Sequence, residues 1–216
     1  MKNENTPLSD IRSEYSKSRL FEKDIPKEPQ GLFEKWFNEA VKANYYLPNS
    51  MIVSTVNKKG APSSRVVLLK AQEENRFTFF SDYSSQKAED LEENPFASIL
   101  FFWNILERQI RIEGKISKSS RESSEKYFLS RPKESQISAI ISNQSKKVAS
   151  YKVLEDRFKK MKEESAGSKL KPPEDWGGYV LAASRYEFWQ GRENRLHDRI
   201  IYENKEKEWE IYRICP

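Results

Sequence analysis

Two different spacings of hydrophobic side chains occur along the chain, and each predicts a different kind of element. Residues 31–44 place large apolar side chains three and four positions apart, which predicts an amphipathic helix. Short runs that are apolar or alternate in polarity predict strands at residues 51–56, 64–70, 76–81, 96–103 and 108–117. In the last run Ile110, Ile112 and Ile116 share one face, so we expect that face to be buried.

The second half of the chain adds helices before strands resume. Helical spacing and breaker residues predict helices at residues 84–93, 119–131, from 132 onward and 147–164. Ser119 and Glu122 have the spacing of a capping box at the start of the second of these. Further strands are predicted at residues 179–188, 195–202 and 208–214. Strands that mostly follow one another, with helices inserted late, predict a mainly β chain with added helices (α+β), built as an antiparallel barrel or sandwich.

The beginning of the chain differs from the rest. The first thirty residues are polar and are interrupted by Pro7, Pro26 and Pro29. We therefore expect residues 1–30 to form a flexible arm with a short helix near residues 11–15. Residues 31–216 are expected to form one folded domain.

Composition narrows the class of protein. The single cysteine among 216 residues excludes an internal disulfide and a cysteine-rich metal site, and with one histidine as well we expect no bound metal. No apolar run approaches the ~18 residues of a membrane span, and the first residues lack the apolar centre of a signal peptide. We expect a cytoplasmic protein with no membrane partner.

Charge argues against a nucleic-acid partner. The chain has 38 Lys and Arg and 33 Asp and Glu, a net charge of +5, but the two signs are interleaved. Nucleic-acid-binding domains instead concentrate their basic residues in a patch or stripe. We expect small anionic ligands to account for the modest positive excess.

The run RVVLLK at residues 65–70 begins and ends with a basic residue. Arg65 and Lys70 differ in parity, so a regular strand directs them to opposite faces. They are either two charges flanking a buried strand or parts of two separate anion sites, one on each side of it. Lys87, near the start of the next predicted helix, could assist one of these sites.

A second group lies at the predicted corner between two helices. Tyr127 and Arg131 are four residues apart and share a helix face, and Ser135 follows near the start of the next helix. Free N–H groups at a helix start favour an anion, so a guanidinium and two hydroxyls here suit a phosphate monoester. The alternative is an ordinary corner with a capping serine.

The only histidine, His197, lies between two arginines. Arg195, His197 and Arg199 follow a period of two, so on a strand all three face the same way. Three cations on one face lower the histidine pKa unless an anion lies among them, which favours a ligand site over a packed structural histidine. Trp189 and Trp176 either stack on a planar ring or pack in the core.

Several longer stretches are together specific. RVVLLK, LERQIRIEGK, YFLSRPKESQISAIISNQS, WGGY and above all FWQGRENRLHDR closely resemble the pyridoxine (pyridoxamine) 5'-phosphate oxidase family, in order from Ile11 to Pro216. The resemblance implies an FMN-binding split β-barrel and a homodimer with FMN at the subunit interface. It also implies oxidation of pyridoxamine and pyridoxine 5'-phosphate to pyridoxal 5'-phosphate, with O2 as final acceptor giving H2O2.

The resemblance also assigns site residues. It implies FMN contacts from Arg65, Val66, Val67, Leu68, Leu69, Lys70, Phe80, Ser81, Gln86, Lys87, Gln109, Gln144, Ser145, Trp189 and Arg199. It implies that the substrate phosphate is held by Lys70, Tyr127, Arg131 and Ser135. Arg195 and His197 would be the catalytic pair against the substrate ring, and Arg12 and Tyr15 of the arm would cover it.

One position departs from the family pattern, and it bears on flavin affinity. Gln86 stands where the family commonly has arginine, which leaves Lys87 and Arg65 for the FMN phosphate. Three other functions remain open: a flavin or vitamin carrier without turnover, a basic nucleic-acid-binding module, and an oxidase acting on a different aromatic substrate. The expected phosphate clamp disfavours the last of these, because an unphosphorylated substrate does not need it.

Overall fold

The structure is a computed structural model that describes residues 7–11, 14–206 and 208–216. Its chain contacts divide into two compact units. The terminal unit contains the residues up to Pro48, Phe101–Arg111 and Arg185–Pro216, and the central unit contains Asn49–Leu100 and Ile112–Ser184.

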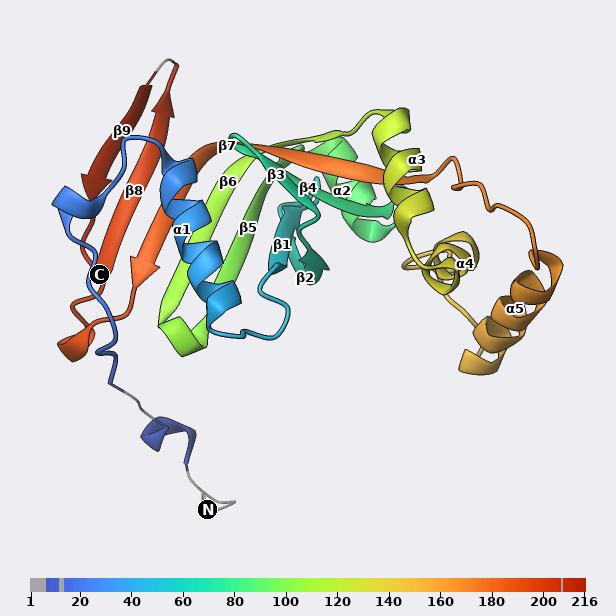
Figure 1. The fold of residues 1–216 in the computed structure, drawn as a ribbon, viewed down its shortest axis with the longest axis horizontal. Coiled ribbons are helices and arrows are strands. Elements are labelled where there is room, and N and C mark those ends of the chain that lie inside the picture. Colours follow the sequence, from blue (N-terminus) through green and yellow to red (C-terminus); the bar gives the residue numbers. More distant parts are fainter. Residues whose placement is uncertain (1–6, 12–13, 207) are drawn as a thin grey trace. The chain divides into compact units, whose positions relative to one another are not determined.

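The elements follow the expected order closely (Figure 1). The strands are β1 (Ser50–Val56), β2 (Pro62–Leu68), β3 (Ala71–Glu73), β4 (Arg76–Asp82), β5 (Phe96–Trp103), β6 (Arg108–Lys118), β7 (Trp176–Gln190), β8 (Asp198–Lys205) and β9 (Glu208–Arg213). The α-helices are α1 (Pro29–Lys42), α2 (Gln86–Glu93), α3 (Arg121–Ser130), α4 (Lys133–Ile141) and α5 (Tyr151–Glu164). Among the strands and α-helices, sequence patterning missed only the short strand β3. The short helix expected near residues 11–15 is wrong for residues 11, 14 and 15, which are not helical, and residues 12–13 lie outside the described residues; a 3-10 helix lies earlier, at Leu8–Asp10.

The strands form one sheet in the order β2-β1-β5-β6-β7-β4-β3, to which β8 adds by pairing with β7, and β9 by pairing with β8. The pairs β1–β2, β1–β5, β3–β4, β4–β7, β7–β8 and β8–β9 are antiparallel. This confirms the mainly antiparallel α+β class. Along these pairings β2 and β3 remain at the two ends of the path, so the sheet does not close on itself.

The cores of both units rest on side chains that the periodicity identified. In β6, Ile110, Ile112 and Ile116 are buried, as their shared face predicts. In the terminal unit α1 buries Phe33 and Trp36, and the Trp36 ring meets Phe188 of β7 edge to face at 5.4 Å. Aromatic packing of this kind fixes the helix on its strands.

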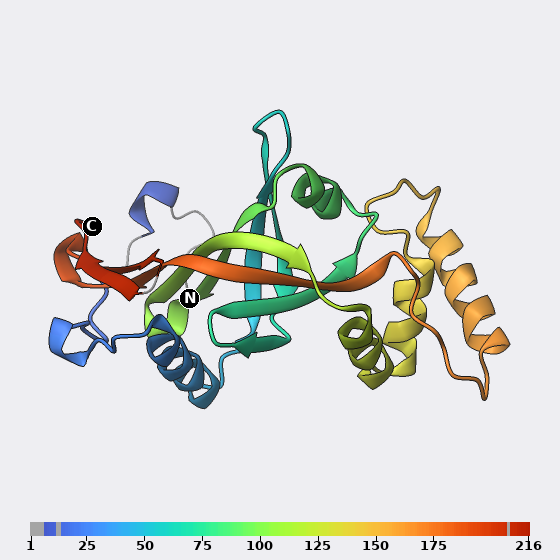
Figure 2. The same ribbon diagram turned by 90° about the horizontal axis from the view of Figure 1, so that it is seen from above.

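Helices α3, α4 and α5 of the central unit lie together where β6 ends and β7 begins (Figure 2). The predicted capping box is wrong in its first residue, because Ser120 rather than Ser119 accepts a hydrogen bond from the Ser123 N–H. Ser119 instead shares a hydrogen bond with Ser124 at 3.0 Å. Helix α5 begins at Tyr151, later than residue 147, because the preceding residues form a loop.

The described residues bear on two classes of function, membrane proteins and metalloproteins. None of the described helices combines the length and apolar character needed to cross a membrane. The same part of the chain holds no group of three or more histidine, cysteine, aspartate or glutamate side chains placed to bind a metal ion.

Candidate active site

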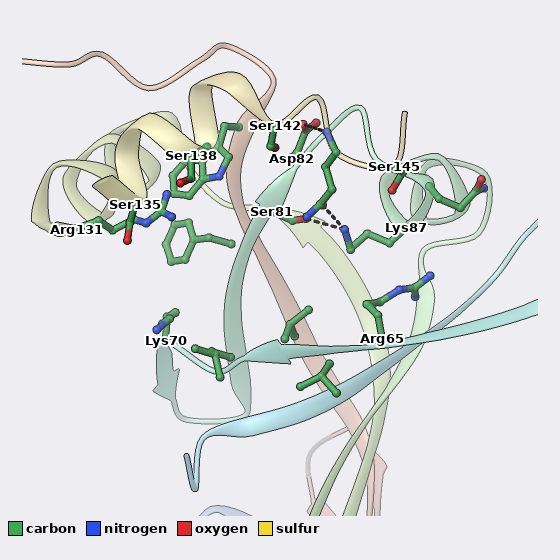
Figure 3. A pocket seen from close by; sticks show the side chains of 18 of the residues that line it. Arg65, Lys70, Ser81, Asp82, Lys87, Arg131, Ser135, Ser138, Ser142 and Ser145 are labelled. Atoms are coloured by element: carbon green, nitrogen blue, oxygen red, sulfur yellow. Dashed lines mark hydrogen bonds between the residues drawn. The ribbon is translucent and has the colours of Figure 1, made fainter. Parts of the chain in front are cut away.

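The central unit contains a cavity of about 920 Å³. It lies between β2, the end of β4, the start of α2, helices α3 and α4, and the loop after α4. Figure 3 shows Arg131, Ser135 and Lys70 at one end and Lys87, Arg65 and Ser145 at the other. The cavity therefore presents two separate groups of cations and hydroxyls.

Lys87 is the buried cation of one end. Its ammonium donates hydrogen bonds to Ser81 Oγ at 2.9 Å, Ser85 Oγ at 3.0 Å and Gln144 Oε1. Among the described residues no carboxylate pairs with it. Burial, and then the charge of Arg65, lower the pKa of Lys87 to about 8. An ammonium held by neutral oxygens in a cavity wall is prepared for an anion.

Arg65 supports this end from β2. Its guanidinium donates to Thr55 Oγ1 and Ser63 Oγ, both at 2.8 Å, and lies 3.8 Å from Asp90. Burial lowers the pKa of Arg65, and Asp90 opposes that shift. Gln86 lines the same end, and its amide donates to Asp90 Oδ1 at 3.1 Å, so it adds no charge where the family commonly has arginine.

A buried aspartate shapes the loop beside Lys87. Asp82 accepts hydrogen bonds from the Ser84 N–H at 2.6 Å and from the Gln144 N–H at 3.0 Å. The loop residues Asn143 and Ser145 have positive φ angles of 40° and 69°. Non-glycine residues in this region cost free energy, so the Asp82 contact helps to hold the loop that carries Gln144 and Ser145.

The other end is built on stacked aromatic rings. Phe80 and Tyr127 stack with centroids 3.9 Å apart, and the Arg131 guanidinium lies 5.1 Å from the Trp176 ring centroid. The Arg131 Nη1 is buried and makes no hydrogen bond, and burial lowers the pKa of Arg131. Ser135 lies on the same wall. An oxyanion here would satisfy the unpaired donor.

Lys70 corrects one expectation. The parity argument placed Arg65 and Lys70 on opposite faces of a strand, but both line this one cavity. Strand β2 ends at Leu68, and the Lys70 N–H donates to the Thr78 carbonyl of β4 at 2.8 Å. The strand period therefore no longer applies at Lys70. The two groups of basic residues that the sequence analysis considered therefore lie at two ends of a single cavity.

A second cluster of predicted residues lies in the terminal unit. The Tyr15 ring meets the Trp189 and His197 rings edge to face, with centroids 5.6 Å apart in both cases, and Trp189 lies 4.7 Å from His197. A Cβ at Gly191 would come within 2.7 Å of the Tyr15 ring. Glycine is needed at this position because the tyrosine packs directly on the backbone.

The segment after Tyr15 is held by two carboxylates of the terminal unit. Glu107 Oε2 accepts hydrogen bonds from the N–H groups of Ser16 and Lys17 at 2.9 and 3.0 Å. Asp198 Oδ2 accepts one from the Leu20 N–H at 3.0 Å. These contacts keep Tyr15 against His197.

His197 is fixed in one tautomer. Its Nδ1 accepts a hydrogen bond from the Arg192 backbone N–H at 3.1 Å, so the neutral ring carries its proton on Nε2. Burial, and then the charge of Arg195, lower the pKa of His197. The ring is thus neutral near pH 7 and its Nε2–H is available to a ligand.

The expected shared strand face of Arg195, His197 and Arg199 is wrong. Strand β8 begins only at Asp198, because Asn194 and Arg195 have φ angles of 55° and 61°, which no strand contains. The Arg195 side chain is exposed and has no hydrogen bond or ion pair in the part of the chain that the structure describes. Its guanidinium is therefore free to meet a ligand.

Arg199 is held by a buried carboxylate. Glu187, 3% exposed, accepts hydrogen bonds from Arg199 Nε at 2.7 Å and from Arg111 Nη2 at 2.6 Å. Arg199 Nη1 also donates to the Cys215 carbonyl at 2.8 Å. The guanidinium that the resemblance assigns to FMN is thus fixed within its own unit.

We expect Glu187→Gln to lower the free energy of unfolding by about 1–3 kcal/mol, because charge-assisted hydrogen bonds to two arginines are lost. Thermal or urea unfolding measures the effect. Glu203→Gln is the matched control, because Glu203 is more exposed and pairs with Lys205 at the surface. Equal stability of the two variants would contradict the expectation.

The sequence-derived residues thus fall into two groups. Those that line the cavity are Arg65, Val66, Val67, Leu68, Lys70, Phe80, Ser81, Gln86, Lys87, Tyr127, Arg131, Ser135, Gln144 and Ser145. Those that do not line it but belong to the terminal unit are Tyr15, Gln109, Trp189, Arg195, His197 and Arg199. Leu69 is buried and does not line the cavity, and Arg12 lies outside the described residues.

Sequence reasoning missed several polar residues of the cavity. Ser138 of α4 and Ser142 at the C-cap of α4 line it beside Ser135, and the spacing of three and four residues could have revealed the shared face. Asp82 also lines it; this residue lies between the strand predicted at 76–81 and the helix predicted at 84–93, and a turn signal of the run Asp82-Tyr83-Ser84 could have drawn attention to it.

The donor set suits two anionic groups. Lys87, which is buried, and Arg131, whose Nη1 is buried, lie at opposite ends of one cavity, and within the described residues neither has a carboxylate partner in an ion pair. Aromatic rings and the apolar side chains of Val66 and Leu68 line the space between them. A flavin phosphate at Lys87 and a substrate phosphate at Arg131 fit this arrangement.

Two family models match the chain. The model described as "Pyridoxamine 5'-phosphate oxidase" matches residues 37–164. The model described as "Pyridoxine 5'-phosphate oxidase C-terminal dimerisation region" matches residues 176–216.

Relatives and solved structures agree with these models. The "Pyridoxine/pyridoxamine 5'-phosphate oxidase" of Leptospira biflexa is 46% identical over 97% of this chain and 99% of that protein. PhzG of Burkholderia lata, in complex with tetrahydrophenazine-1-carboxylic acid, is 26% identical with a TM-score of 0.86, over 92% of this chain and 98% of that one. A pyridoxamine 5'-phosphate oxidase-related, FMN-binding protein of Nostoc punctiforme shares the fold, at 16% identity and a TM-score of 0.70, over 89% of this chain and 99% of that one. The chain belongs to the pyridoxamine 5'-phosphate oxidase family.

Proposed function

We propose that this chain is an FMN-dependent oxidase that converts pyridoxamine 5'-phosphate and pyridoxine 5'-phosphate to pyridoxal 5'-phosphate. The observation that carries the proposal is the cavity with a cation at each end that makes no ion pair with a described residue, in a chain of this family. When bound, FMN supplies an acceptor for the two electrons of the substrate, which pass to dioxygen and yield hydrogen peroxide.

At the flavin end, Lys87 and Arg65 bind the FMN phosphate. The oxygens that accept hydrogen bonds from Lys87 position its ammonium, and the loop that is held by Asp82 lies beside it. Gln86 contributes only an uncharged amide there, so Lys87 supplies a larger share of the positive charge that meets the phosphate.

At the other end, Arg131, Lys70, Tyr127 and Ser135 bind the substrate phosphate. The buried Arg131 Nη1 gains the acceptor it lacks, and the Trp176 ring holds the guanidinium plane. Binding the phosphate far from the reacting carbon orients the substrate ring without contacting the bond that changes.

Arg195 and His197 act on the substrate ring. His197 donates from Nε2 to a ring substituent, because its Nδ1 is occupied by the Arg192 N–H. Arg195 supplies an unpaired guanidinium that presses the ring towards the flavin. Tyr15 packs on His197 and keeps water away from it.

The working enzyme is a homodimer in which a second copy completes each site. The match of residues 176–216 to a dimerisation region supports this, since that segment carries Trp189, Arg195, His197 and Arg199. A monomer with full flavin occupancy and full activity would contradict it.

The relative bound to tetrahydrophenazine-1-carboxylic acid supplies the rival function, an oxidase of unphosphorylated aromatic acids. Anaerobic addition of pyridoxamine 5'-phosphate to the FMN-loaded protein decides between them. We expect the yellow flavin absorbance to bleach, and to return with peroxide release when air is admitted. Bleaching by unphosphorylated pyridoxamine with equal KM, or no bleaching by the phosphate ester, would overturn the proposal.

We expect Arg131→Lys to raise the KM for pyridoxamine 5'-phosphate about tenfold, because lysine keeps the charge but loses the paired donors of the guanidinium. The FMN dissociation constant should stay unchanged. Arg157→Lys on the exposed helix α5 is the matched control. Steady-state kinetics and FMN titration test both, and an altered FMN affinity would place Arg131 at the wrong end.

A further inference from the structure

Glu107 is a buried carboxylate of the terminal unit that the proposed mechanism does not use. It is 9% exposed and follows the short 3-10 helix Asn104–Leu106. Within the described residues it makes no ion pair, and its side chain accepts hydrogen bonds only from two backbone N–H groups. Its φ of 56° lies in the left-handed region, which is costly for glutamate. A buried charge on a strained backbone indicates a specific role.

The side chain of Glu107 holds the segment that directly follows Tyr15. Its Oε2 accepts hydrogen bonds from the N–H groups of Ser16 and Lys17 at 2.9 and 3.0 Å. The Lys17 ammonium also donates to the Ile105 carbonyl in the same short turn. Two donors on one charged oxygen fix the course of the main chain more firmly than a neutral contact does. The position of Tyr15 therefore depends on this carboxylate.

The main chain of Glu107 holds the opposite side of the same contact. Its carbonyl accepts hydrogen bonds from the Gly191 N–H at 2.7 Å and from Gln190 Nε2 at 3.2 Å. Gly191 begins the segment that leads to His197, and the Tyr15 ring packs directly on its backbone. One residue thus binds both segments whose rings meet, through its carboxylate on one side and its carbonyl on the other.

A second carboxylate holds the segment further from Tyr15. Arg213 donates hydrogen bonds to Glu22 Oε1 at 2.7 Å and to the Leu20 carbonyl at 2.8 Å. Glu22 is exposed, and its ion pair lies beyond Leu20 in the chain. Because Glu107 binds the two residues next to Tyr15, the two carboxylates should differ in their effect on that ring.

We propose that Glu107 is a positioning residue, which holds Tyr15 against His197 and so keeps the imidazole directed at the substrate ring. The second part rests on the proposed function, in which His197 donates from Nε2. The Arg192 N–H fixes the Nδ1 side of the imidazole, and the Tyr15 ring packs on it with centroids 5.6 Å apart. A side chain locked by both packing and a hydrogen bond keeps one rotamer, and loss of the packing frees it.

Three variants of the FMN-loaded protein test this role. Glu107→Gly removes the acceptor, and glycine adopts the left-handed φ without strain, so the fold is little disturbed. Glu107→Gln loses the charge but keeps an acceptor oxygen. Glu22→Gln is the matched control, because it alters a carboxylate that holds the same segment at another place.

We expect Glu107→Gly to exchange the N–H groups of Ser16 and Lys17 with solvent at least tenfold faster. Flavin reduction by pyridoxamine 5'-phosphate should slow about tenfold, with the FMN dissociation constant of the parent. Glu107→Gln should recover most of both effects, because the role requires an acceptor and no cation takes part. Glu22→Gln should match the parent in the reduction rate and in exchange at residues 16–17.

The histidine ring supplies a readout that does not depend on activity. The chain has a single histidine, so isotope-labelled histidine gives one ring signal in a magnetic resonance spectrum. In Glu107→Gly this signal should move towards its position in Tyr15→Ala, because both changes remove the same aromatic ring from His197.

The outcomes separate the two proposals. If exchange at residues 16–17 or the histidine signal of Glu107→Gly stays as in the parent, Glu107 does not hold Tyr15. Faster exchange with reduction at the parent rate would overturn the positioning role, and so would equal losses in the glycine and glutamine variants. If pyridoxamine 5'-phosphate fails to reduce the flavin of the parent, the proposed function is wrong, while exchange and the histidine signal still decide whether Glu107 holds Tyr15.

Discussion

Replacing Lys87 by methionine should weaken FMN binding about 10- to 150-fold and make the cofactor-free protein more stable. The loss of affinity corresponds to one charge-assisted contact to phosphate. The gain in stability follows because Lys87 is only 6% exposed and its pKa is lowered to about 8. That shift corresponds to about 3 kcal/mol of unfavourable burial, partly offset by three hydrogen bonds that the variant lacks.

FMN fluorescence quenching and thermal unfolding with and without FMN test the two effects separately. Lys146→Met is the matched control, because Lys146 pairs with Glu89 at the exposed surface. A variant that is less stable without FMN, or that binds FMN as the parent does, would contradict this role of Lys87.

The same lysine predicts a pH dependence of opposite sign for folding and for binding. Its pKa is about 8 in the folded chain, against an ordinary value of 10.5, so the unfolded chain binds more protons between these values. The stability of the cofactor-free protein should therefore receive a positive contribution as pH rises through this window. FMN affinity should fall over the same range, because the neutral amine no longer attracts phosphate. Lys87→Met should lack both trends.

Arg195→Leu should slow reduction of bound flavin by pyridoxamine 5'-phosphate roughly 100-fold, because orientation of the reacting groups supplies rate enhancements of this size. The structure argues for a ligand role. Of the nearby arginines, Arg192 pairs with Asp198 at 3.0 Å and Arg199 pairs with Glu187. Within the described residues Arg195 has no such partner, so neutralising a neighbouring carboxylate is not its function.

Anaerobic stopped-flow reduction measures the effect directly. Arg195→Lys should recover part of the rate, since it keeps the charge and loses the planar group. Arg192→Leu is the contrasting variant: it removes a structural ion pair and should act mainly on stability. Reduction at the parent rate in an Arg195→Leu protein with normal FMN binding would exclude the proposed role.

The sequence predicted most elements because local spacing alone determines them. Ile110, Ile112 and Ile116 alternate on a strand that stays regular, and all three are buried as expected. The same reasoning failed where the backbone leaves the regular period. Lys70 follows the end of β2, and Arg195 has a left-handed φ, so counting residues gave the wrong faces for both.

The interaction partners of the site residues within the chain were harder to predict than the site residues themselves. The motifs identified Arg199 and Lys87. No local pattern shows that Glu187 accepts a hydrogen bond from Arg199, or that Lys87 forms an ion pair with no described carboxylate. Such pairings depend on which side chains the sheet brings together across long stretches of chain. The role of Gly191 likewise became clear only from the ring of Tyr15, far away in sequence.

The cations Lys87 and Arg131 make the amount of folded protein depend on the supply of its anionic ligands. Lys87 is 6% exposed and the Arg131 Nη1 is buried, and neither side chain makes an ion pair with a described residue, so the empty chain bears a cost that bound anions reduce. By mass action, ligands that bind only the folded chain raise its stability with their free concentration. Where riboflavin is scarce, more of the newly made protein should unfold transiently and be degraded by proteases. The level of this protein in the cell should then follow flavin supply even at constant synthesis.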